Sequence, residues 1–149
     1  MKVSEHFTMA ELTVSDTAAR LRIDNSVPPE LYGNIQKLAN RMEMVRAILG
    51  KPIHVNSAFR CKKLNDAIPG SSKVSAHMSA LAMDFVCQEF GSPLDICRAL
   101  KDHKELCFDQ LIFEHSWVHI GFKADDREAR GQLLTANNPG AGVSYKVGF

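Results

Sequence analysis

The sequence predicts an α+β fold in which helices pack on one side of a small antiparallel sheet. Three observations predict it: one long amphipathic helix, several short segments of alternating apolar residues, and two such segments separated by only two residues. With 149 residues, of which 45% are hydrophobic, the chain suffices for one domain with its own core. We expect this domain to span residues 1–123 and residues 124–149 to form a loosely packed C-terminal tail.

The long helix is predicted to follow the two prolines at positions 28 and 29. Apolar residues then recur at alternating steps of four and three, namely Leu31, Ile35, Leu38, Met42, Val45 and Leu49. This spacing places them on one face of a helix, and Gly50 directly after them is a typical helix end. Upstream of this helix, the first 26 residues show only a weak apolar pattern.

Two strands and a second helix are predicted in the middle of the chain. The first strand is indicated by two apolar residues that alternate with polar neighbours, Ile53 and Val55. Residues 61–81 are rich in Ser, Gly, Asn and Lys and are expected to be mostly loop. Residues 81–87 form the second candidate strand. Ser92, as a cap before a proline, begins a helix that we expect to run to about Leu106.

A hairpin is predicted near the end of this domain. The segments FDQLIFE and WVHIGF read as strands, and only His115 and Ser116 separate them. A two-residue turn places Ile112 opposite His119, so that Glu114 and His119 project to the same side. A slip of one residue would move Glu114 to the other face.

Composition excludes several classes of function. The chain has 18 Lys and Arg against 17 Asp and Glu, and this balance argues against a nucleic-acid binder with a basic footprint. No apolar stretch approaches the roughly 20 residues that cross a bilayer, and no signal peptide is visible. The four cysteines form no C-x-x-C pair, so we expect reduced thiols in structural roles. We therefore expect a monomer made in the cytoplasm, with neither nucleic acid nor membrane as a partner.

Three residues form a candidate metal site. Asp84 lies between two large apolar residues, where a buried carboxylate needs a cationic partner. His77 precedes it in the Ser-rich segment, and His119 lies on the last predicted strand. Two imidazoles and one carboxylate suffice for a catalytic zinc ion that activates water and polarises a carbonyl. Glu114 is the candidate general base, and Arg60 is the candidate cation for a substrate carboxylate or oxyanion.

These residues lie in segments that resemble a family of zinc peptidases. S-A-H-M-S-A-L-A-M-D at 75–84, followed by W-V-H at 117–119, resembles the S-x-H-x-x-G-x-A-x-D and terminal-His pattern of D-alanyl-D-alanine carboxypeptidases and L-alanyl-D-glutamate endolysins. The stretch I-H-V-N-S-A-F-R-C-K-K-L-N resembles the family's S-G-Y-R segment. F-T-M-A-E-L and D-Q-L-I-F-E are similar to its small phage and prophage branch, so the likeness spans residues 5–123.

The resemblance implies a role for each matching residue. His77, Asp84 and His119 would bind one Zn²⁺ per chain. Arg60 would bind substrate or stabilise the oxyanion, and Ser75 would donate a hydrogen bond near the metal or to substrate. The resemblance also implies the single-domain fold that this family shares with hedgehog signalling domains.

The match departs from the family pattern at four positions. Many members place the acidic base three residues before the last His, where this chain has Ser116, and Glu114 is the nearest acid. Ala58 and Ala80 replace two glycines of the pattern, and Phe59 replaces a tyrosine. If position 80 needs a positive φ, Ala is disfavoured there.

We expect a zinc-dependent peptidase that hydrolyses a peptide bond in the peptidoglycan stem, of carboxypeptidase or endopeptidase type. It would act at the cell wall after release from the cell or as a virion component. One alternative is a non-catalytic zinc module that binds cell-wall fragments or a protein. A second alternative is a structural zinc site whose fourth ligand is His54 or Cys61.

Overall fold

The computed structural model describes residues 1–72, 74–137 and 144–149. Helices and strands occur along the chain in this order: α1 (Met9–Thr13), α2 (Asp16–Leu21), η1 (Pro29–Leu31), α3 (Tyr32–Leu49), β1 (His54–Ser57), α4 (Lys62–Ala67), η2 (Ala76–Ser79), β2 (Ala82–Val86), α5 (Pro93–Leu100), η3 (Lys104–Leu106), β3 (Gln110–Phe113), β4 (Val118–Gly121), η4 (Asp126–Glu128), β5 (Gln132–Ala136) and β6 (Tyr145–Val147). The α+β class is therefore confirmed.

One sheet contains all six strands in the order β1-β2-β4-β3-β5-β6. Every neighbouring pair is antiparallel except β3 and β5, which are parallel. The expectation of a purely antiparallel sheet is wrong at this pair. After β4 the chain reverses and returns on the far side of β3, so β5 runs antiparallel to β4 and hence parallel to β3.

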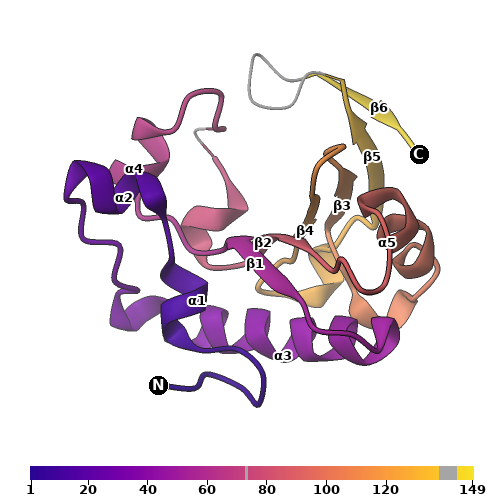
Figure 1. Cartoon of the computed structure of the whole chain (residues 1–149), viewed down its shortest axis with the longest axis horizontal. Helices are drawn as coiled ribbons and strands as arrows, with labels where there is room; N and C mark the ends of the chain where they lie inside the picture. Colours follow the sequence, from indigo (N-terminus) through magenta and orange to yellow (C-terminus); the bar gives the residue numbers. More distant parts are fainter. Residues whose placement is uncertain (73, 138–143) are drawn as a thin grey trace.

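The predicted long helix is α3, and it lies along one side of the sheet (Figure 1). Its apolar stripe is buried, from Ile35 through Leu38, Met42 and Val45 to Leu49, and these side chains join the main core. Gly50 ends the helix with φ 68°, a conformation in which a glycine has no steric penalty. None of the described helices is both long and apolar enough to span a bilayer.

The hairpin register also agrees with the prediction. Ile112 pairs with His119, and the backbone N–H of Glu114 donates to Trp117 O at 3.1 Å. The turn tip is His115, with φ 64°. Glu114 therefore stays on the same face as His119, because the strands have not slipped.

The sheet has one core face and one face that forms the floor of a cleft. Along β4, Val118 and Ile120 belong to the core, whereas His119 and Gly121 alternate with them on the other face. The same alternation in β2 buries Met83 and Phe85 in the core and turns the intervening residue toward the cleft.

Two local predictions need correction. Residues expected to be mostly loop include α4, which Cys61 caps by accepting the Leu64 N–H on its sulfur at 3.4 Å. Burial of Leu64 favours this helix. The helix that begins after Ser92 ends at Leu100 rather than near Leu106, and a separate 3₁₀ turn, η3, buries Leu106.

The described residues after Lys123 are part of the fold rather than a loosely packed tail. β5 pairs with β3 along the whole length of β3, and β6 pairs with β5. Asp126 binds Lys37 at 2.8 Å and Arg41 at 2.6 Å, which ties η4 to α3. Residues 138–143 of the expected tail lie outside the described part of the chain.

Candidate active site

His77, Asp84 and His119 converge on one point at the floor of the cleft. η2 supplies His77, and the adjacent strands β2 and β4 supply Asp84 and His119 as a directly opposed pair. Asp84 Oδ1 lies 2.8 Å from His119 Nδ1 and 3.3 Å from His77 Nε2. One potential ligand atom from each residue lies within 4.8 Å of the others, and this is the one such cluster of three in the described residues.

The neighbours of His77 fix which of its nitrogens is available. Its Nδ1 lies 2.6 Å from the carbonyl oxygen of Ala58, which makes Nδ1 the protonated nitrogen and leaves the Nε2 lone pair facing Asp84. Ser75 accepts the backbone N–H of His77 on its Oγ at 3.1 Å and so caps η2. Ala80 ends η2 with φ 59°, so the position does need a left-handed backbone, and an alanine adopts it.

Asp84 is buried but strongly stabilised as a carboxylate. Burial alone would raise the pKa of its carboxyl group, yet His77 and His119 together hold that pKa far below its usual range. Its second oxygen, Oδ2, accepts a hydrogen bond from Arg60 Nη2 at 3.3 Å. The cation that the sequence required beside Asp84 is therefore present.

The geometry of this cluster fits a small divalent metal ion. Metal–ligand bonds of about 2.0–2.2 Å in a tetrahedral site set ligand atoms roughly 3.4 Å apart. The 3.3 Å between Asp84 Oδ1 and His77 Nε2 is close to this separation, and the 2.8 Å between Asp84 Oδ1 and His119 Nδ1 is shorter and corresponds to a hydrogen bond. A carbonyl on the remote nitrogen of a ligand histidine and a cation on the remote oxygen of a ligand carboxylate are the usual supporting contacts. Ala58 and Arg60 supply them here.

A family model for peptidase M15 matches residues 5–121, which is more than half of the chain. The chain belongs to the peptidase M15 family. No curated protein matches it significantly. In this M15 peptidase the matched region contains all six residues singled out above, whereas β5 and β6 lie beyond it.

His77, Asp84 and His119, called the metal cluster below because they could hold a metal ion, open into a cleft of about 650 Å³. Its lining includes every residue that the sequence predicted for the site, namely Arg60, Ser75, His77, Asp84, Glu114 and His119. A peptidase needs such an open hollow because a peptide must reach the reacting groups from solvent.

Glu114 is half-buried in this cleft. Burial raises the pKa of its carboxyl group above the usual range; His119 opposes that shift, and the carboxylate of Asp84 reinforces it. A raised pKa moves a carboxylate toward the range in which it accepts a proton effectively near neutral pH. Ser116, by contrast, lies exposed in the turn and outside the cleft lining.

Arg60 is the principal cation beside the metal cluster. Its Nε donates to Ser57 Oγ at 3.1 Å and its Nη2 to Asp84, so Nη1 has no partner among the described residues. Burial lowers the pKa of the guanidinium, while Asp84 and Glu114 oppose that shift. The group remains charged, since an arginine pKa starts above 12.

Four ionisable residues of the cleft lining were not predicted from the sequence: Asp109, Lys123, Arg130 and Tyr145. Arg130 and Tyr145 belong to the segment that was expected to be a tail. Tyr145 is carried by β6, and burial together with the nearby carboxylates of Glu114 and Asp84 raises the pKa of its hydroxyl. The alternation in Y-K-V was a weak strand signal, and only the parallel pairing of β5 with β3 brings this segment to the cleft.

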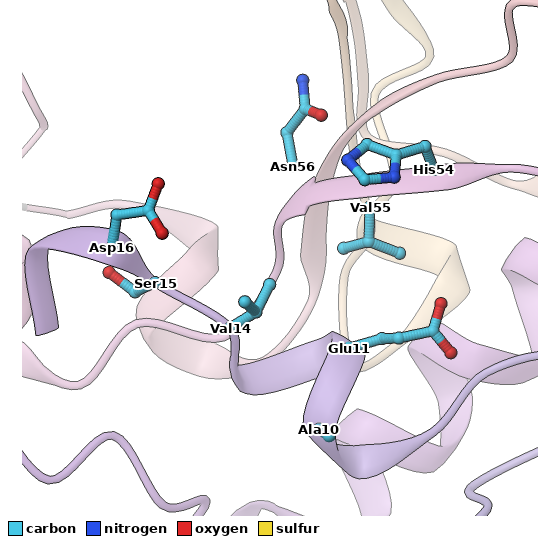
Figure 2. A pocket seen from close by; sticks show the side chains of 8 residues that line it. All are labelled: Ala10, Glu11, Val14, Ser15, Asp16, His54, Val55 and Asn56. Atoms are coloured by element: carbon cyan, nitrogen blue, oxygen red, sulfur yellow. The ribbon is translucent and has the colours of Figure 1, made fainter. Parts of the chain in front are cut away.

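Neither candidate for a fourth metal ligand, His54 or Cys61, belongs to the cluster of His77, Asp84 and His119. Cys61 caps α4 instead. His54 lies on the edge strand β1 and lines a separate hollow of about 680 Å³ (Figure 2). In Figure 2 the carboxylates of Glu11 and Asp16 lie apart on either side of that hollow, so His54 has no converging donor set. A closed four-ligand structural site is therefore not formed by the described residues.

Proposed function

We propose that this M15 peptidase is a zinc enzyme that hydrolyses a peptide bond in the stem peptide of peptidoglycan. One observation carries the proposal: two imidazoles and a carboxylate converge in the floor of an open cleft that Glu114 and Arg60 also line. The substrate class follows from the motif resemblance around residues 75–84 and 117–119.

His77, Asp84 and His119 would hold the zinc ion. Zinc bound there would supply a lowered pKa for a water molecule and would polarise the substrate carbonyl. The donor set of two nitrogens and one oxygen, with a buried and ionised carboxylate, suits this metal.

Glu114 would act first as the general base and then as the general acid. Its carboxylate accepts the proton of the attacking water and passes it to the amine that leaves. The raised pKa of this group supports the role, because a stronger base takes that proton more readily.

Arg60 and Ser75 would bind the substrate. The guanidinium has N–H donors on Nη1 that bind no described residue, and these could bind a substrate carboxylate or the oxyanion that develops on the attacked carbonyl. The Ser75 hydroxyl uses an acceptor site for the His77 N–H, so its own hydrogen stays available to a peptide carbonyl.

The proposal is tested with purified peptidoglycan and zinc-loaded protein, by measuring newly released amino groups. The wild type should release them, whereas Glu114→Gln should lose about 10²–10⁴-fold in rate while keeping its zinc. Glu128→Gln is the matched control, because Glu128 is exposed in η4 and outside the cleft lining.

Two results would contradict the proposal. Undiminished hydrolysis by Glu114→Gln would remove Glu114 from the mechanism. A zinc-loaded wild type that binds peptidoglycan without cutting it would instead support the non-catalytic module.

A further inference from the structure

One end of the cleft carries two cations that the proposed mechanism does not use. Lys123 follows β4 by two residues, and Arg130 precedes β5 by two, and both line the cleft. Gln110, at the start of β3, pairs with Gly121 on one side and with Gln132 on the other. Lys123 and Arg130 therefore lie at the same end of the sheet, although they come from different connections.

This end has a surplus of positive charge. Arg130 donates from Nε and Nη2 to the two oxygens of Asp109 at 2.9 and 2.8 Å, and its backbone N–H adds a third bond. Arg130 holds the pKa of Asp109 below its usual range, so that carboxylate is ionised and balances one cation. Lys123 is half-buried, and its ammonium has no salt bridge within the described residues. One positive charge is left over.

The residues His77, Asp84 and His119 and this cationic end line the same cleft. His119 lines it from β4 and Lys123 from the residues that follow β4, whereas Gly121 between them is buried and is not part of the lining. Gly121 has no side chain, and a Cβ placed there would lie 3.5 Å from His119 Nε2. Lys123 lies four positions after His119, which corresponds to at most about 13 Å at roughly 3.3 Å per residue of extended chain.

We propose that Lys123 and Arg130 form a subsite for a carboxylate of the peptide substrate, away from the scissile bond. This inference rests on the proposed function and narrows it. Both residues line the cleft, and a distance of at most about 13 Å from His119 corresponds to roughly four residues of extended peptide, so the bound carboxylate would lie two to four residues from the bond that is cut. A carboxypeptidase substrate carries its terminal carboxylate within one residue of that bond. The subsite therefore favours endopeptidase cleavage of a longer acidic peptide.

The test uses two synthetic stem-type peptides of identical sequence, cut at an internal bond, one with a free C-terminal carboxylate and one with a C-terminal carboxamide. The wild type should show a kcat/KM about tenfold higher for the acid peptide, which is the usual order for one charge-assisted contact. Lys123→Met should remove most of that preference and leave the amide peptide unaffected. Lys101→Met, an exposed lysine outside the cleft lining, should behave as the wild type.

Salt provides a second readout. The preference for the acid peptide should shrink between 50 and 500 mM salt, because the cations are partly exposed. Arg130 is left in place, since its loss would strand the buried Asp109 carboxylate.

The outcomes separate the two proposals. Equal cleavage of both peptides by the wild type, or equal losses on both for Lys123→Met, would overturn the subsite while the peptidase assignment stands. No cleavage of either peptide or of purified peptidoglycan would overturn the proposed function, and the subsite with it.

Discussion

Arg60 binds the oxygen of Asp84 that the histidines leave free. Its Nη2 lies 3.3 Å from Oδ2, whereas Oδ1 faces the imidazoles of His77 and His119. The carboxylate is thus held from both sides, and its orientation does not depend on a bound metal. If the cluster binds zinc as proposed, Arg60 would support the orientation of Asp84 besides any contact with substrate.

Replacement of Arg60 by Gln should therefore weaken metal binding. Contacts of this kind typically change metal affinity about 10–100-fold, and competition with a chromophoric chelator measures that change. Arg98→Gln is the control, because Arg98 is exposed on α5. An unchanged zinc affinity in Arg60→Gln would show that the ion pair does not orient Asp84.

Gly121→Ala should separate folding from turnover. The added Cβ would meet its nearest neighbours at 3.5 to 4.0 Å, which is ordinary contact distance, so the melting temperature should change little. The same methyl group would lie 3.5 Å from His119 Nε2 and 3.9 Å from the Cβ of Ala76, so it would crowd the imidazole of His119. We expect a lower kcat, and an unchanged kcat would show that the His119 ring tolerates the added methyl group.

Tyr145→Phe should lower kcat/KM about two- to tenfold, the usual worth of one hydrogen bond. The raised pKa of this hydroxyl keeps it protonated at neutral pH and available as a donor in the cleft. Zinc content should stay the same, since Tyr145 is outside the metal cluster. Activity equal to that of the wild type would show that the Tyr145 hydroxyl makes no hydrogen bond to the substrate and that only the aromatic ring contributes to the cleft.

Asp126 should make stability depend on pH below 4. Hydrogen bonds from Arg41 and then Lys37 lower its pKa to about 2. A carboxyl group whose pKa is lower in the folded state stabilises the fold above its unfolded pKa of 3.8, and that contribution is lost as the pH falls toward 2. The Asp126 side chain is 40% exposed, so solvent screening limits its contribution to the unfolding free energy to about 1 kcal/mol.

Chemical denaturation of the wild type and Asp126→Asn at pH 6 and pH 2.5 measures this contribution. The difference in unfolding free energy between the two proteins should be fully present at pH 6 and fall to roughly a third of that value at pH 2.5, where the Asp126 carboxyl group of the folded protein is still mostly ionised. A difference that does not change with pH would mean that η4 is not held to α3 through these charges.

The sequence was most informative where local rules decide the structure. A two-residue turn at His115 and Ser116 is enough to set the hairpin register, and the register is enough to bring Glu114 to the side of His119. The heptad-like spacing of α3 likewise needs no information from elsewhere in the chain.

The features that were missed depend on contacts between distant segments. α4 is only six residues long and uses a cysteine cap, which no common capping rule suggests. β5 is a strand because β3 offers it an open edge, and nothing in residues 132–136 specifies a parallel partner. Because β5 and β6 were missed, the cleft residues Arg130 and Tyr145 were missed with them.

The most direct test of the account is the zinc content of the purified protein. The wild type should retain about one zinc ion per folded chain after dialysis, and His77→Ala should retain none. His103→Ala is the matched control, because His103 lies far along the chain, half-exposed beside Glu105, and should keep the metal. Circular dichroism confirms that all three are folded. A folded wild type that stays free of zinc even after the metal is added would contradict the metallopeptidase assignment.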